Sequence, residues 1–140
     1  MMSIVNYLGC NFLLPASDPE SDNEIIVGDF FSDDEMRAEV HKHLSAKYIC
    51  EVTSSQHGSI WFNKYYKQDY PKGHEEGQQI FKSLCAFLDQ HLASGDYCEL
   101  YTCWVGDESE EPEYKDCINL HDFDIDKIEV LEKSLLVINK

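Results

Sequence analysis

The apolar residues of this chain fall into short segments, and this pattern limits the folds it can adopt. Most segments are rich in β-branched and aromatic residues and are separated by glycine, proline or acidic residues, as is typical of strands. The predicted strand segments are residues 3–14, 25–27, 47–53, 59–66, 96–105, 117–120, 128–131 and 135–138. The first of them is either one strand or an irregular strand pair interrupted near Gly9. The spacing predicts a hairpin from 47–53 and 59–66 and a final hairpin from 128–131 and 135–138. Segment 117–120 is expected opposite 96–105.

Two other segments carry apolar residues at helical spacing. Residues 74–93 form the clearest helix, with apolar side chains at Ile80, Phe81, Leu84, Cys85, Leu88 and Leu92. A shorter helix is predicted over residues 32–45, because Ser32 and Glu35 have the spacing of a capping box. These strand segments and the two helices predict a single α+β domain spanning residues 1–140. Its sheet is expected to be mostly antiparallel, with about six strands and both helices packed on one face.

Acidic residues are concentrated in two parts of the chain. Residues 17–35 contain eight carboxylates and no Lys or Arg, and residues 96–140 contain thirteen Asp or Glu against four Lys. The formal net charge is −16. Two acidic loops are expected, near residues 15–24 and 106–116. Such a surface repels nucleic acid and anionic membranes and attracts basic partners.

The segment before residue 117 is the strongest candidate for a binding site. It combines a run of carboxylates with Pro112, which makes regular structure unlikely there, and with Tyr114 and nearby Trp104 as aromatic anchors. A second acidic run follows at residues 122–126. The alternative interpretation is a solvated loop. The candidate partner-binding residues are Asp107, Glu108, Glu110, Glu111, Glu113, Tyr114, Asp122 and Asp124.

No motif indicates a catalytic or metal site. His41 and His43 lie two apart on a predicted helix, so their side chains diverge and His43 is expected near the apolar stripe. Cys98 and Cys103 lie five apart on a predicted strand and face opposite sides of it. The sequence also lacks phosphate-binding loops and nucleophile motifs. We therefore predict a protein that is not an enzyme and that has no catalytic residues, cofactor or metal.

The run Asp122-x-Asp124-x-Asp126 resembles the start of an EF-hand calcium loop. Position six of that loop requires glycine and position twelve requires glutamate, but this chain has Lys127 and Lys133 there. A half-buried segment with an acidic outer edge is the simpler interpretation.

The start of the sequence lacks the basic and apolar regions of a signal peptide, and no window is long and apolar enough to span a membrane. These features predict a soluble cytoplasmic protein. Its six cysteines are then expected to be mostly reduced core residues, because free cysteine behaves as a small apolar residue.

In its acidic runs at 18–35 and 107–126 and its compact α+β pattern, the chain resembles the immunity proteins that bacteria make against polymorphic and contact-dependent growth inhibition toxins. The resemblance concerns general character and transfers no binding residue. It implies a tight complex with a cognate toxin domain, often a basic nuclease, whose active site or an adjacent surface is covered.

Two alternatives come from other classes. A regulatory or adaptor domain would use its acidity for solubility alone and would bind a partner that is not basic. A small hydrolase is less favoured, because it would need His, Cys and Asp side chains to converge in a pocket. The sequence leaves the toxin, the strand order and the oligomeric state open.

Overall fold

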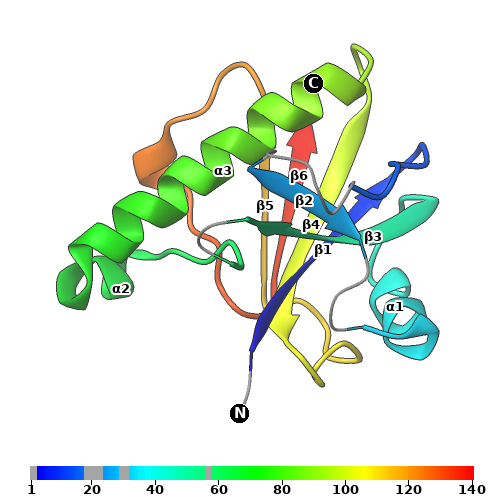
Figure 1. The fold of residues 1–140 in the computed structure, drawn as a ribbon, viewed down its shortest axis with the longest axis horizontal. Helices are drawn as coiled ribbons and strands as arrows, with labels where there is room; N and C mark the ends of the chain where they lie inside the picture. The colour runs from blue at the N-terminus through cyan, green and yellow to red at the C-terminus, as the bar shows by residue number, and fades with distance from the viewer. Residues whose placement is uncertain (1–2, 18–23, 29–31, 56–57) are drawn as a thin grey trace.

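A computed structural model describes residues 3–17, 24–28, 32–55 and 58–140. The chain forms one open sheet with helices against it (Figure 1). The strands are β1 (Ile4–Cys10), β2 (Ile25–Gly28), β3 (Tyr48–Ser54), β4 (Tyr97–Trp104), β5 (Tyr114–Asn119) and β6 (Ser134–Asn139). The helices are α1 (Asp34–His41), α2 (Lys64–Asp69) and α3 (Pro71–His91), and a 3-10 turn, η1, spans Ile125–Lys127.

The sheet has six strands in the order β2-β3-β1-β4-β6-β5. Every neighbouring pair is antiparallel except β5 and β6, which are parallel. The predicted fold class, a single α+β domain with a mostly antiparallel sheet, is confirmed. Strand β5 differs from the expectation, because it pairs with β6 rather than with the strand that precedes it in the sequence.

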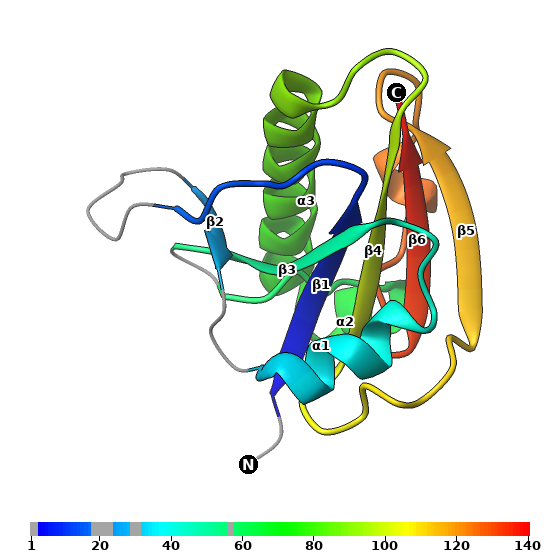
Figure 2. The same ribbon diagram turned by 90° about the vertical axis from the view of Figure 1, so that its right-hand side faces the viewer.

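The helices differ from the expectation in one respect, because α1 and α3 lie on opposite faces of the sheet (Figure 2). One core cluster joins α3 to Leu8 and Leu100, while a second joins Val40 of α1 to Tyr7 and Tyr101. Neighbouring residues of a strand point to opposite faces. Strand β1 is buried on both faces from residue 5 to residue 10, so each face needs its own cover.

The predicted hairpin of residues 47–53 and 59–66 does not form in the part of the chain that the structure describes. Asn63 ends the extended segment instead, because its side-chain oxygen accepts a hydrogen bond from the Tyr66 backbone N–H at 2.8 Å and caps α2. The predicted strand 128–131 contributes only an isolated bridge, in which Val130 pairs with Phe62. The segments expected as arms of two different hairpins therefore meet each other.

Helix α3 packs closely on the segment before α2. A Cβ atom at Gly77 would lie 3.0 Å from both the Phe62 Cβ and the Trp61 carbonyl oxygen, so this position favours glycine. The helix begins with Pro71 at its first turn, three residues earlier than predicted, where proline's missing N–H costs nothing. None of the helices in the described ranges is long and apolar enough to cross a membrane.

The start of α1 differs from the predicted capping box. Asp33, one residue after the expected cap, accepts the Met36 backbone N–H at 2.8 Å. Ser32 instead donates its hydroxyl to Glu51 Oε2 at 2.7 Å, and Glu51 is buried on the α1 face of β3. The helix ends at His41, earlier than predicted.

The six cysteines are all free thiols, and their environments differ. Cys10, Cys85, Cys98 and Cys103 are buried, Cys50 is half-buried and Cys117 is exposed on β5. Cys98 and Cys103 face opposite sides of β4, as predicted. A hydrogen bond to Cys98 and burial raise the pKa of Cys10, and burial raises the pKa of Cys85 to about 12.

These environments predict that one thiol of the native protein reacts quickly with a disulfide reagent. The disulfide reagent DTNB requires an accessible thiolate, so we expect Cys117 to react first and the buried thiols to react only as the protein unfolds. The absorbance of the released thionitrobenzoate at neutral pH measures the number of protein thiols that have reacted. In Cys117→Ser the fast phase should disappear, and a fast phase of the same size in that variant would contradict the assignment.

Candidate protein-interaction surface

The acidic loop, residues 107–113, connects β4 to β5 and has a fixed backbone. The Asp107 N–H donates to Trp104 O at 2.9 Å, and the Glu110 N–H donates to Asp107 O at 2.9 Å. The Glu113 N–H donates to Lys133 O at 2.7 Å, in the turn before β6. The loop is therefore tied down at both ends, and its side chains project from a defined backbone.

Side chains on the α1 face of the sheet hold the middle of the acidic loop. The Tyr101 hydroxyl donates to Glu110 O at 2.6 Å, and a ring nitrogen of His43 lies 3.1 Å from Glu108 O. The two rings pack with centroids 5.4 Å apart, so His43 lies beside the apolar cluster as predicted. Burial, followed by the negative groups nearby, raises the pKa of Tyr101, which keeps the proton that it donates.

Glu108 does not belong with the exposed candidates. Only 3% of the residue is exposed, and its carboxylate accepts the Tyr7 hydroxyl at 2.9 Å and the Gly106 N–H at 2.8 Å. Burial and this hydrogen bond raise the pKa of Tyr7, so its hydroxyl stays a donor. The prediction that Glu108 offers its charge to a partner is corrected, because the carboxylate anchors the acidic loop to β1.

The other candidates in the acidic loop face solvent. Asp107 is half-buried, Glu110, Glu111 and Glu113 are exposed, and Tyr114 is 55% exposed. Among the described residues, Glu113 Oε1 forms an ion pair with Lys133 Nζ at 3.7 Å. The acidic loop therefore presents negative charge that the protein itself does little to neutralise.

Asp122 and Asp124 lie beyond the other end of β5. Both are exposed, but each also has a local structural role. The Asp122 N–H donates to Asn119 O at 3.1 Å, and Asp124 accepts the Asp126 N–H at the start of η1. The acidic loop and this second run are not one patch, since the length of β5 separates them.

The first acidic block joins this surface only in part. Residues 18–23 and 29–31, including Asp22, lie outside the described residues. Glu24 leads into β2, at the opposite edge of the sheet from β5. Helix α1 lies beside the acidic loop in both views (Figures 1 and 2), but Asp34 pairs with Arg37 at 2.6 Å and Glu39 with Lys42 at 2.9 Å.

A hollow lined by tyrosines adjoins the start of β5, and the sequence did not predict it. This tyrosine hollow has a volume of about 510 Å³ and is lined by Trp61, Asn63, Tyr65, Tyr66, Asp69, Tyr70, Tyr114, Leu131 and Glu132. Tyr65 and Tyr70 are 70% and 61% exposed. Tyr66 contacts both Trp61 and Tyr70, with ring centroids 4.7 and 5.1 Å apart. The sequence offered no clear signal, because Tyr66 and Tyr70 lie four residues apart and share one side of a helix and one face of a strand alike.

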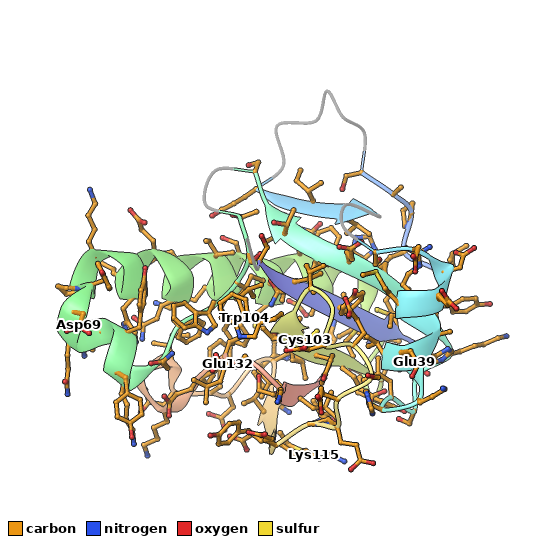
Figure 3. All side chains as sticks on the ribbon, turned by 90° about the horizontal axis from the view of Figure 1, so that it is seen from below. Glu39, Asp69, Cys103, Trp104, Lys115 and Glu132 are labelled. Carbon is orange, nitrogen blue, oxygen red and sulfur yellow. The ribbon has the colours of Figure 1, made fainter. Side chains whose placement is uncertain are left out.

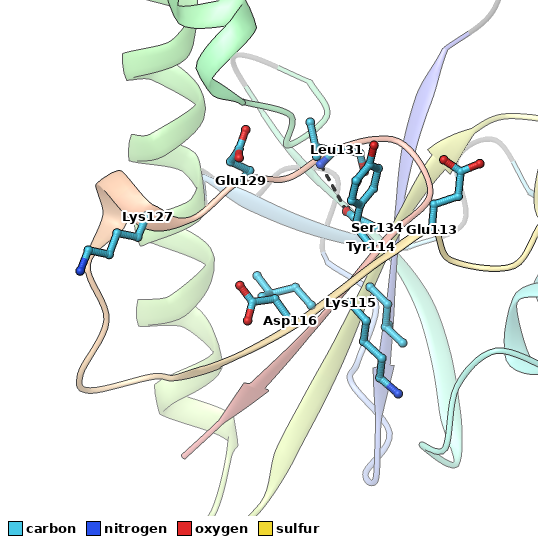
Figure 4. Close-up of a pocket in the computed structure, with 10 residues that line it drawn as sticks. Glu113, Tyr114, Lys115, Asp116, Lys127, Glu129, Leu131 and Ser134 are labelled. Atoms are coloured by element: carbon cyan, nitrogen blue, oxygen red, sulfur yellow. Dashed lines mark hydrogen bonds between the residues drawn. The ribbon is translucent and has the colours of Figure 1, made fainter.

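A second hollow, of about 390 Å³, lies between β5 and residues 127–131 (Figure 4). We call it the edge hollow. Asp116, Glu129 and Tyr114 line it, together with Leu131, which also lines the tyrosine hollow. Asp116 and Lys115 project to opposite sides of β5 (Figure 4). The acidic loop, the edge hollow and the tyrosine hollow thus form a continuous surface at this edge of the sheet.

This surface has the properties of a protein contact. Exposed tyrosines are among the residues that dominate the energy of interfaces, and the fixed carboxylates beside them are able to pair with basic groups of a partner. Among the residues that the structure describes, no three His, Cys, Asp or Glu side chains are grouped so as to hold a metal ion. No protein-family model, curated protein or solved structure was found to match this chain.

Proposed function

We propose that this protein is an immunity protein, which binds a basic toxin domain in the cytoplasm and neutralises it through the acidic loop. The observation that supports this proposal is the exposed set of carboxylates on a fixed backbone, with little compensating charge. A surface that is already ordered loses little entropy on binding. Carboxylates arranged in this way can pair with the Lys and Arg residues by which a nuclease holds phosphate groups.

The net charge supports the same proposal through association kinetics. A protein with a formal charge of −16 attracts a basic partner over distances set by salt screening. Steering of this kind speeds association and weakens as the ionic strength rises. Fast capture suits a protein that must stop a toxin before it acts.

The test uses the toxin domain encoded by the reading frame next to this gene. Co-expression with this protein should restore the growth of cells that produce that domain. The double variant Glu110→Lys/Glu111→Lys should bind the purified domain at least about tenfold more slowly at low salt, because both side chains are exposed and steer association. Stopped-flow fluorescence measures this rate at several salt concentrations.

The matched control is Glu24→Lys/Glu75→Lys, which makes the same change in charge at exposed positions on the opposite edge of the sheet and on α3. It should slow association much less. If both double variants associate as fast as the native protein at low salt, the acidic loop is not the contact. If the neighbouring domain is harmless, or its toxicity is unaffected by this protein, the immunity function is wrong.

An adaptor or regulatory domain is the second candidate, and the tyrosine hollow is the observation that favours it. Exposed Tyr65 and Tyr70 could bind an apolar partner without any contribution from the acidic loop. In that case substitution of Tyr70 would weaken binding, while salt and loop charge would have little effect.

A further inference from the structure

The outer edge of β5 is open. The Tyr114 N–H donates to Lys133 O at 3.2 Å and the Leu120 N–H donates to Asn139 O at 2.7 Å, so even-numbered residues of this segment face β6. In a parallel pair, the backbone groups of the intervening residues then point away from the sheet. These residues are Lys115, Cys117 and Asn119.

Part of this outer row is already occupied within the chain. The Cys117 N–H donates to Asp116 Oδ1 at 2.8 Å, and Asn119 forms an isolated antiparallel bridge with Asp122, whose N–H donates to Asn119 O at 3.1 Å. The N–H and C=O of Lys115 and the C=O of Cys117 have no protein partner among the described residues. The free groups therefore lie in the first four residues of the strand.

The opposite edge of the sheet is covered. The Val27 N–H donates to the Ser17 hydroxyl and Val27 O accepts the Ser17 N–H, both at 2.9 Å. Proteins usually protect their edge strands by such a cover, because an open edge invites pairing with another chain. The β5 edge therefore offers free backbone groups to a partner strand, whereas the described part of the β2 edge is paired with Ser17 at Val27.

The side chains around β5 indicate the chemistry of that partner. Alternate residues of an added strand would point to the side of the sheet that carries α3, beside the edge hollow with Asp116 and Glu129. The edge hollow contains three carboxylates and two lysines, and the tyrosine hollow next to it adds Asp69 and Glu132 without a cation. Figure 3 shows Lys115 at the margin of the molecule, well away from Asp69. The acidic loop and Asp122 extend the negative charge beyond both ends of the strand.

We propose that the outer edge of β5 binds an extended segment of the partner protein, in which Lys or Arg alternates with apolar residues, as an additional strand. Backbone hydrogen bonds to Lys115 and Cys117 provide the affinity, and basic side chains facing Asp116 and Glu129 provide the selectivity. A second copy of this chain fits less well, because two surfaces of the same negative charge repel each other. The basic character of the partner rests on the proposed function, whereas the open edge does not.

The test uses a ten-residue peptide of alternating Lys and Val, because it has the proposed chemistry without any toxin. Binding should slow hydrogen exchange of the Lys115 amide by at least about tenfold at saturation, as measured by NMR. A peptide of alternating Glu and Val should have no effect. The Lys/Val peptide with N-methyl groups on the residues that face β5 should also fail, since it lacks the donors.

A variant of the protein provides an independent check. Lys115→Pro removes an outward N–H while leaving the hydrogen bonds between β5 and β6, and proline is tolerated on edge strands. It should bind the Lys/Val peptide at least about tenfold more weakly than Lys115→Ala, which keeps the N–H. If N-methylation leaves affinity unchanged, or if only the amides of the acidic loop respond, the edge proposal is wrong.

The same pair of variants separates this proposal from the proposed function. If Lys115→Pro and Lys115→Ala neutralise the neighbouring toxin domain equally well, β5 is not its docking site, although the immunity function holds. If the Lys/Val peptide protects the Lys115 amide but that domain is not neutralised, the edge proposal holds and the toxin is not the partner.

Discussion

Glu108→Ala is expected to lower the free energy of unfolding by about 3 kcal/mol, although the residue lies in a loop of exposed carboxylates. The substitution leaves the buried Tyr7 hydroxyl and the Gly106 N–H without their acceptor. An unpaired polar group in the interior costs more than the hydrogen bond contributed, because it has lost water as well. Urea denaturation followed by circular dichroism measures the change.

The control is Glu111→Ala, three residues further along the acidic loop and exposed, which should change stability by less than about 0.5 kcal/mol. Tyr7→Phe/Glu108→Ala removes the stranded hydroxyl together with its acceptor. The double variant should therefore be less destabilised than the sum of the single variants, by about 1–2 kcal/mol. Equal effects of Glu108→Ala and Glu111→Ala would contradict the anchoring role.

Asn6→Ala is expected to cost about 4 kcal/mol, because one buried amide satisfies several groups. The Asn6 side chain donates to Ile60 O and to the Thr102 hydroxyl, both at 2.9 Å, and accepts the Ile60 N–H at 2.7 Å. In the variant, the buried N–H and C=O of Ile60 lose this hydrogen-bond partner. The segment that leads to α2 and the tyrosine hollow would lose its hydrogen bonds to Asn6 of β1.

Urea denaturation again measures this change, and Asn11→Ala serves as the control. Asn11 is exposed and its amide pairs with Asp96 at 3.1 Å, so its loss should cost less than about 0.5 kcal/mol. A loss below 1 kcal/mol for Asn6→Ala would show that water replaces the amide. Should Asn6→Ala fail to fold, Thr102→Val tests the same network more gently, with an expected loss of about 1–2 kcal/mol.

The fold class was predictable because the apolar periodicities are strong. Residues of α3 such as Ile80, Leu84 and Leu88 repeat at helical spacing and are buried along one side, as expected. The segment with Phe62 and Tyr66 was not predictable in the same way. Aromatic residues favour strands in general, but one capping hydrogen bond at Asn63 converts the second half of this segment into a helix.

The candidate site was predictable as a region but not residue by residue. A run of carboxylates before Tyr114 identifies an acidic loop, yet composition does not distinguish Glu108 from Glu110. Their roles differ because Tyr7, 101 residues before Glu108 in the chain, donates its hydroxyl to Glu108 and not to Glu110. The tyrosine hollow was missed for a related reason, since it depends on long-range pairing of Phe62 with Val130.

The strand order also determines when the β5 surface comes into existence. Strand β6 follows β5 in the chain but lies between β4 and β5, so β5 has no neighbour until β6 has docked. A nascent chain synthesised only as far as β5 contains β1, β3 and β4 but lacks the β6 that holds β5 in the sheet. Binding through β5 would therefore require a fully folded chain, and a misfolded copy would not bind the partner.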